Sequence, residues 1–206
     1  MEPQAIQTAL SLYSDKLCAL LILLDKNKHE NNELNKICDL NGCDFHFDSI
    51  NQQKSLAFNH HQTAMSVGDF YITKHSNLSQ VHVIFHLQSF DTNQSNNTSD
   101  LKHSDLSSRH PIILGLRNVL KACVLNDIQT LTFPLLLTHE MSEEMTISWV
   151  MKRAELVLKC IKGFMIEFVN WGAQESRTLQ FVVPQVSHFR YLSFIFISVQ
   201  INGTIY

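Results

Sequence analysis

The spacing of hydrophobic and polar positions along this chain changes several times, and each change marks the border of a predicted element. The segment from Pro111 to Leu125 has apolar residues at helical spacing and begins with a proline, which fits the first turn of a helix. Residues 128–134 alternate as a strand does. A polar loop at 138–144 leads into a long amphipathic helix that ends near Phe168, and residues 178–183 form a further strand. This strand, helix, strand order predicts a βαβ unit, and such folds place ligands at the carboxyl ends of their strands.

The first half of the chain adds further strands to this unit. Leu17–Leu24 is an unbroken apolar run, so we expect a strand buried on both faces, and its length is too short to cross a membrane. Residues 68–74 and 81–87 are also predicted strands, the second alternating strictly, with His82, Ile84 and His86 at every other position. Residues 5–14 predict a short helix, and residues 52–67 fit a helix or a loop. The whole pattern favours an α/β fold with three layers, in which a mixed sheet has helices on both faces.

The length and composition indicate one soluble domain. A chain of 206 residues can bury one substantial core. We expect a single α/β domain over residues 1–185, interrupted by a polar segment at about 91–109 that has too few apolar residues to order itself. Residues 186–206 form an apolar run without a clear pattern, and we expect this tail to be foreign to the fold.

Charge and cysteine content restrict the partners and the compartment. The net charge of −3 argues against a dedicated nucleic-acid surface, which would be basic. The five cysteines are scattered, and the sequence begins without a signal peptide. We therefore expect a reducing, cytoplasmic location.

Candidate catalytic and metal-binding motifs are incomplete. His139 and Glu140 suggest a zinc motif, but Glu143 stands where the second histidine would be needed. Cys38, Cys43 and His46 could supply three zinc ligands, without an evident fourth. The sequence has no Gly-x-Ser-x-Gly nucleophile elbow, and the loops at 26–33 and 135–142 lack the glycines that phosphate cradles need. We expect no catalytic residue, no metal and no cofactor.

The polar loop and the long helix supply the candidate interaction residues instead. Glu143 and Glu144 fall in a predicted first helical turn, where they would complement the helix dipole, and an acid/base role would require a cleft with shifted pKa values. Trp149 belongs to a broad apolar face that is expected to pack on the sheet, although tryptophan is also favoured at binding hot spots. Lys152 and Arg153 lie on the same helix. The interaction-surface candidates are Glu143, Glu144, Trp149, Lys152 and Arg153.

Three segments carry a resemblance to a known family. They are residues 10–25, residues 68–87, and residues 115–184, the last including Met141-Ser-Glu-Glu-Met-Thr146 and Lys159-Cys-Ile-Lys-Gly-Phe-Met165. In this order they resemble the C-terminal half of the third subunits of the FERRY complex. The resemblance covers about residues 5–185 apart from the polar insertion, and the family's long helical N-terminal region is missing before Ala5.

The resemblance implies a non-enzymatic scaffold or adaptor. FERRY is a multi-subunit effector of an early-endosomal Rab GTPase and links messenger RNAs to endosomes for transport. A larger coiled-coil subunit makes most of the Rab contact. This chain would therefore bind the other FERRY subunits, contact the Rab GTPase and mRNA only indirectly, and lie at the periphery of early endosomes without membrane insertion.

A more distant resemblance concerns the fold. The order of strands 70–74 and 81–87, helix 111–125 and strand 128–134 is similar to that of a macro domain. Macro domains hold ADP-ribose in glycine-rich loops, and those glycines are absent after Asp25 and after Pro134. The alternative function is therefore a degenerate macro-like module that binds a nucleotide or an ADP-ribose-type ligand.

The tail at 186–206 departs from the family, which continues with a helix after Gln185. We expect the tail to be translated intron, since valine, the residue at position 186, is what the opening GT of an intron would encode. The missing helix would leave one face of the sheet partly uncovered and prone to aggregation. Sequencing of the transcript tests this expectation, and a spliced message that encodes the same tail would contradict it.

Overall fold

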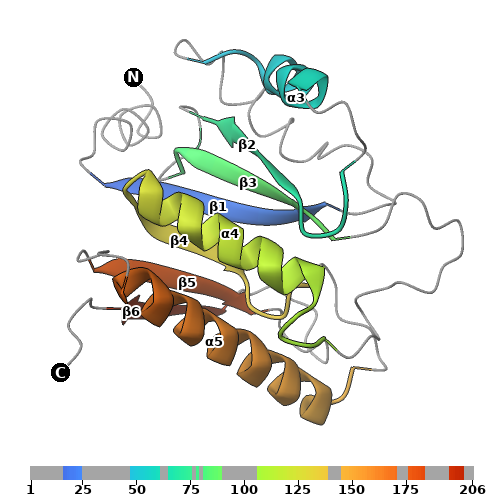
Figure 1. The fold of residues 1–206 in the computed structure, drawn as a ribbon, viewed down its shortest axis with the longest axis vertical. Helices are drawn as coiled ribbons and strands as arrows, with labels where there is room; N and C mark the ends of the chain where they lie inside the picture. The colour runs from blue at the N-terminus through green and yellow to red at the C-terminus, as the bar shows by residue number, and fades with distance from the viewer. Residues whose placement is uncertain are drawn as a thin grey trace, which may run out of the picture.

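A mixed sheet forms the centre of the fold (Figure 1). The computed structural model describes residues 16–24, 47–60, 65–75, 78, 81–89, 106–138, 145–170, 176–183 and 195–201. Within these ranges the strand order is β2-β3-β1-β4-β5-β6. The inner strands β3, β1, β4 and β5 run parallel to one another, and the edge strands β2 and β6 pair antiparallel with β3 and β5. The strands are β1 (Leu17–Leu24), β2 (Phe70–Lys74), β3 (Val83–Gln88), β4 (Ile128–Pro134), β5 (Arg177–Val183) and β6 (Ile195–Ile201).

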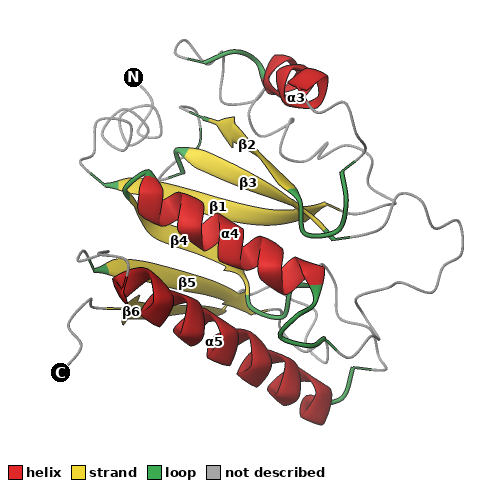
Figure 2. Cartoon of the chain, viewed as in Figure 1, coloured by secondary structure: helices red, strands yellow, loops and turns green. Residues whose placement is uncertain are grey.

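Helices cover both faces of this sheet. Helices α4 (Pro111–Leu125) and α5 (Ile147–Asn170) lie side by side on one face (Figure 2). Helix α3 (Ile50–His60) packs against β2 on the other face, where the ring of Phe58 contacts Tyr71. The neighbouring residue Phe70 points the opposite way and meets Phe85 in the main core. The predicted three-layer α/β architecture is confirmed, and the macro-domain likeness stays a prediction.

The main core lies between the sheet and helices α4 and α5. Side chains of alternating strand positions meet the apolar faces of the two helices, as period-2 and period-3.6 patterns require. Leu21 of β1, Phe85 of β3 and Phe133 of β4 are fully buried there. The expectation that β1 is buried on both faces is wrong for its second face, where Leu20 and Ile22 are only half-buried. Helices α4 and α5 pack on the first face. On the second face α3 packs near the β2 edge, so β1 is less covered there.

Helix α4 has the boundaries that the sequence predicts. His110 caps it with an extended backbone, and its imidazole Nδ1 accepts a hydrogen bond from the backbone N–H of Ile112 at 3.2 Å. Pro111 follows as the first helical residue, where the missing N–H costs nothing. The predicted strands at 128–134, 68–74, 81–87 and 178–183 are also confirmed. The ambiguous segment at 52–67 contains helix α3, and the helix predicted at 5–14 lies outside the described residues.

The insertion that was expected to be disordered and the tail that was expected to be foreign to the fold are each partly built into the domain. Leu106 packs against the core, and the N–H of His110 donates to the carbonyl oxygen of Ser107. Residues 106–109, at the end of the predicted disordered insertion, are therefore folded. The remainder of that insertion, 91–105, lies outside the described residues. In the tail, β6 pairs with β5 from Ile195 opposite Val183 to Ile201 opposite Arg177, so this part has strand character rather than no pattern. The intron origin of the tail stays a prediction.

The loop before β2 and the first half of α4 approach each other closely at two glycines. Gly68 has a φ of +91°, in the region that favours glycine. A Cβ atom on Gly115 would lie 2.8 Å from the Cα atom of Gly68, closer than real Cβ contacts allow. Gly115 is therefore required by packing against a backbone that cannot move aside. The glycine in the middle of α5, Gly163, has no atom within 4 Å of the corresponding position.

We expect Gly115→Ala to destabilise the protein by about 1–3 kcal/mol, because the added methyl group overlaps the backbone of Gly68. The matched control is Gly163→Ala, which should stabilise it by about 0.5–1 kcal/mol because alanine favours an open helix position. Urea unfolding of both variants measures the difference. Equal effects at the two glycines would show that the contact with Gly68 does not constrain α4.

Candidate functional site

The first half of α5 contains the predicted interaction residues that the structure describes. Trp149 and Arg153 lie four residues apart on one side of the helix, where side chains meet. The guanidinium carbon of Arg153 lies 4.7 Å from the centre of the Trp149 ring, which is a cation–π contact. Lys152 is exposed, and Trp149 is half-buried. Glu143 and Glu144 lie outside the described residues.

Arg153 differs from the expectation for a surface candidate, because its side chain is only 4% exposed. It faces the start of α4, where burial and then the positive charge of Arg153 lower the pKa of the His110 imidazole. Arginine has a long apolar stem and stacks readily on aromatic rings, so it tolerates this position better than lysine. Helical spacing places Arg153 between Trp149 and Val157 on the apolar face of α5, whereas its charge suggested a surface position. Any partner contact by Arg153 stays a prediction.

A second polar contact joins the two helices near the other end of α5. The guanidinium of Arg117 on α4 donates two hydrogen bonds to the carboxylate of Glu167, with Nε 2.9 Å from Oε2 and NH2 bonded to Oε1. Such a paired geometry is specific to arginine. The hydrogen bond raises the pKa of Arg117 and lowers the pKa of Glu167. The pair links α4 and α5 at a partly exposed position.

Helix α5 exposes large apolar residues on the side away from Glu167 and α4. The exposed set on this helix is Ile147, Met151, Leu158 and Ile166. Three exposed lysines, Lys152, Lys159 and Lys162, accompany them. Our sequence-based choice of residues missed this apolar set. The signal was present, because apolar residues occur on more of the circumference of α5 than one buried face can use.

A cluster of buried polar rings lies on the second face of the sheet. The hydroxyl of Thr73 on β2 is 2.8 Å from Nε2 of His75 and 2.7 Å from Nε2 of His86 on β3. The ring of Tyr71 stacks on His86, with centres 4.3 Å apart and planes 7° from parallel. Thr73, His75 and His86 are buried. A hydroxyl has one proton, so Thr73 can donate to at most one of the two imidazoles, and at least one ring donates its Nε2–H to the Thr73 oxygen.

The cluster fits a structural role better than a catalytic one. Burial, followed by the charges of Lys54 and His75, lowers the pKa of His86 to about 3, so it is a neutral ring at physiological pH. The side chain of Gln53 on α3 extends the network, since its amide bonds both the N–H and the carbonyl of Lys74 at 2.7 and 2.9 Å. The network joins α3, β2 and β3. The strand pattern indicated His86, but only the fold brings His75 to it.

The remaining candidate residues, the cysteines and the possible metal ligands, form no reactive or metal-binding group among the described residues. Cys123 is buried on α4, and burial raises the pKa of its thiol to about 12, which confirms its prediction as a small hydrophobic residue. Among the residues described, no three His, Cys, Asp or Glu side chains converge as a metal site would need. Cys38, Cys43, His46 and His139 lie outside those residues.

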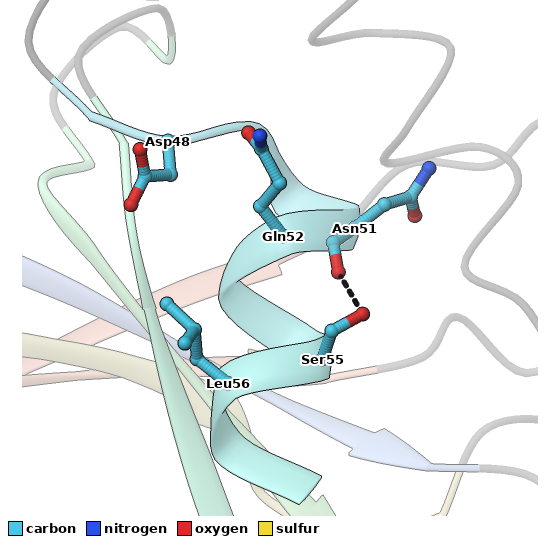
Figure 3. Close-up of a pocket in the computed structure, with 5 residues that line it drawn as sticks. All are labelled: Asp48, Asn51, Gln52, Ser55 and Leu56. Carbon is cyan, nitrogen blue, oxygen red and sulfur yellow. Dashed lines mark hydrogen bonds between the residues drawn. The ribbon is translucent and has the colours of Figure 1, made fainter. Parts of the chain in front are cut away.

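A shallow pocket is present where α3 begins (Figure 3). It is lined by Asp48, Asn51, Gln52, Ser55 and Leu56 and has a volume of about 440 Å³. The hydroxyl of Ser55 donates to the carbonyl oxygen of Asn51 at 2.8 Å, as Figure 3 shows. A nucleophilic serine donates its proton to an adjacent base, whereas Ser55 donates it to a backbone carbonyl. The pocket can offer hydrogen bonds to a polar group, without an arranged pair for covalent chemistry among these five side chains.

The carboxyl end of β4 is the position where an α/β fold of this type would hold a ligand. There the chain continues as Leu135, Leu136 and Leu137, which are all buried. Leu137 has a φ of +51°, a backbone conformation that glycine would adopt more easily. Leu135 and Leu137 belong to the main hydrophobic core, and this segment has no glycine of the kind that lines a phosphate cradle.

Comparison with known proteins places this α/β domain in the class of effector-complex subunits. The family model described as Ferry endosomal RAB5 effector complex subunit 3 matches residues 1–63 and 54–195, so the chain belongs to that family. Curated relatives named FERRY endosomal RAB5 effector complex subunit 3, from Rattus norvegicus, Mus musculus and Homo sapiens, are 40% identical to it over 218 aligned residues. The alignments cover 87% of this chain but only 38% of each relative. The chain therefore spans well under half the length of those proteins.

None of the helices that the structure describes is both long enough and apolar enough to cross a bilayer. Helix α5 has the necessary length, but lysine, arginine and glutamate residues recur along it.

The histidine cluster predicts a specific pH dependence of stability. The pKa of His86 is about 3 when folded and 6.5 when exposed, so only the unfolded chain binds this proton between these values. The free energy of unfolding should therefore fall as the pH drops below about 6.5, by up to about 1.4 kcal/mol per pH unit from this group. Urea unfolding at several pH values between 7.5 and 5 measures the slope. His86→Gln should make the slope shallower by about one proton, and an unchanged slope would contradict the assignment.

Proposed function

We propose that this chain acts as a non-enzymatic scaffold or adaptor subunit of an early-endosomal Rab5-effector complex that links messenger RNAs to endosomes for transport. Membership of the Ferry subunit 3 family supports a place in such a complex. Its direct partners are then the other subunits of the complex, and it reaches the Rab GTPase and mRNA through them. Its location is cytoplasmic, at the periphery of early endosomes.

The observation that carries the non-enzymatic part of the proposal is the segment that follows β4. Three buried leucines, Leu135, Leu136 and Leu137, stand where a phosphate-binding α/β fold would have glycines with open backbone N–H groups. Anionic ligands such as nucleotides need those N–H groups, and leucine side chains provide no replacement for them. This arrangement favours a domain that works through its outer surface.

The outer surface of the first half of α5, residues 147–158, is the proposed contact region. It combines exposed apolar side chains with Lys152 and the half-buried Trp149, and partner surfaces are enriched in such aromatic and apolar anchors. Glu143 and Glu144 precede this helix in the sequence and belong to the same proposed region. The net charge of −3 fits an indirect rather than a direct contact with RNA.

A charge reversal on α5 tests this surface. Lys152→Glu should reduce capture of the purified remaining complex subunits several-fold, with the larger loss at low salt, because a charge at the border of an interface mainly affects association. Lys74→Glu provides the matched control, since it makes the same change on the opposite edge of the sheet. Equal capture by both variants would remove Lys152 from the contact region.

Calorimetry with ADP-ribose tests the non-enzymatic assignment separately. We expect heats no larger than dilution at millimolar ligand. A dissociation constant below about 1 mM would instead favour a ligand-binding module. In that case binding should be lost in Leu137→Asp and retained in Leu125→Asp.

A further inference from the structure

Helix α5 carries an apolar seam that continues beyond its buried part. Apolar residues recur at alternating spacings of four and three along its length. This spacing has a period of 3.5 residues, which is the pattern by which one α-helix packs along another. The seam consists of Ile147, Met151, Ala154, Leu158, Ile161, Met165 and Phe168.

The two halves of this seam have different surroundings. Ile161, Met165 and Phe168 are 2%, 5% and 1% exposed, because they pack into the main core. By contrast, Ile147, Met151 and Leu158 are 77%, 66% and 41% exposed. Ala154 lies between these residues and is half-buried. The C-terminal part of this seam is therefore buried in the core of the domain. The described residues leave its N-terminal part uncovered.

Dimensions explain why the domain cannot cover the whole seam. Helix α5 has 24 residues and is about 36 Å long at about 1.5 Å per residue. Strand β5 beneath it has seven residues and spans about 23 Å at about 3.3 Å per residue. The helix therefore exceeds the strand by about 13 Å, or roughly nine residues. Figure 1 shows that the N-terminal end of α5 is the end that extends past the strands.

The charges beside the seam indicate what kind of helix fits it. Lys162 lies next to the seam, and Lys152 and Lys159 lie further around the exposed surface of α5. The carboxylate of Glu155 lies 2.6 Å from Nζ of Lys159. Among the exposed charges that the structure describes on this surface of α5, three lysines therefore accompany one carboxylate. A second copy of α5 would bring lysines against these lysines, whereas a helix with acidic flanking residues would be attracted.

We propose that the exposed half of the seam, Ile147–Leu158, binds an amphipathic α-helix of another subunit of the complex, one with apolar residues at the same 3–4 spacing and acidic residues beside them. This inference rests on the proposed adaptor function and identifies the chemistry of the partner. Binding would complete the packing of α5 along its length, with its second half against its own sheet and its first half against the partner.

Substitutions on and off the seam test the proposal in the full chain. The double variant Met151→Glu with Leu158→Glu places two carboxylates in the proposed contact, and it should reduce capture of the purified remaining subunits at least about tenfold, because buried charges without partners are costly. The matched control is Ile166→Glu, which changes an equally exposed residue of the same helix outside the seam. It should leave capture within about twofold. Urea unfolding shows that both proteins are folded.

A photo-crosslinking residue at position 158 identifies the occupant directly. The crosslinked peptide should come from another subunit and contain apolar residues at 3–4 spacing with acidic neighbours. A peptide from this chain itself, or self-association that the double variant abolishes, would overturn the proposal in favour of a second copy. Flotation with anionic phospholipid vesicles that the double variant abolishes would overturn it in favour of a lipid surface.

The results separate this inference from the function on which it rests. If the unmodified chain captures none of the purified subunits, both the adaptor function and the seam proposal fail. If the unmodified chain and the double variant capture them equally, the adaptor function stands and the seam proposal alone fails.

Discussion

The packing of α4 across the parallel centre of the sheet determines the arrangement of the other elements. This helix connects β3 to β4 and passes over β1, so that Leu116, Val119 and Leu120 meet the buried side chains of these strands. The glycine contact between Gly115 and Gly68 fixes how closely it approaches the loop before β2. Arg117 then fixes the neighbouring α5 through Glu167. A displacement of α4 would therefore move the surface of α5, where the domain presents its exposed apolar residues.

The two faces of the sheet stabilise the domain in different ways. The face under α4 and α5 is apolar and continuous, and its stability comes from burial of area and from close packing. The second face near its β2 edge is held by hydrogen bonds of specific geometry, in which Thr73 serves two imidazoles and Gln53 serves the backbone of Lys74. Polar groups buried in this way must all be satisfied, so they specify one arrangement of α3, β2 and β3. The cluster makes the second face precise, and the apolar core makes the domain stable.

The proposed adaptor role needs stable positions for side chains that contribute little to the fold itself. In α5 the second half supplies stability through Ile161, Met165 and Phe168, and the first half carries exposed apolar residues. At the carboxyl end of β4, by contrast, Leu135 to Leu137 are buried and belong to the packed part of the domain.

The periodicity of the sequence by itself determined the type of most elements and the α/β class, because alternation and helical spacing are local consequences of which side chains face a core. It predicted α4 and β4 to the residue, since a proline and a change of period mark their borders. Only the tertiary structure decided which polar residues are buried. Arg153 and Lys152 have the same charge, yet Arg153 is buried beside Trp149 and Lys152 is exposed. His75 and His86 meet because β2 and β3 pair in one register, and Ile195–Ile201 gains its strand role from the open edge of β5. The apolar periodicity of α5 predicts the length of this helix. Which part of its seam stays uncovered also depends on the length of β5, and the local pattern of α5 holds no information about that strand.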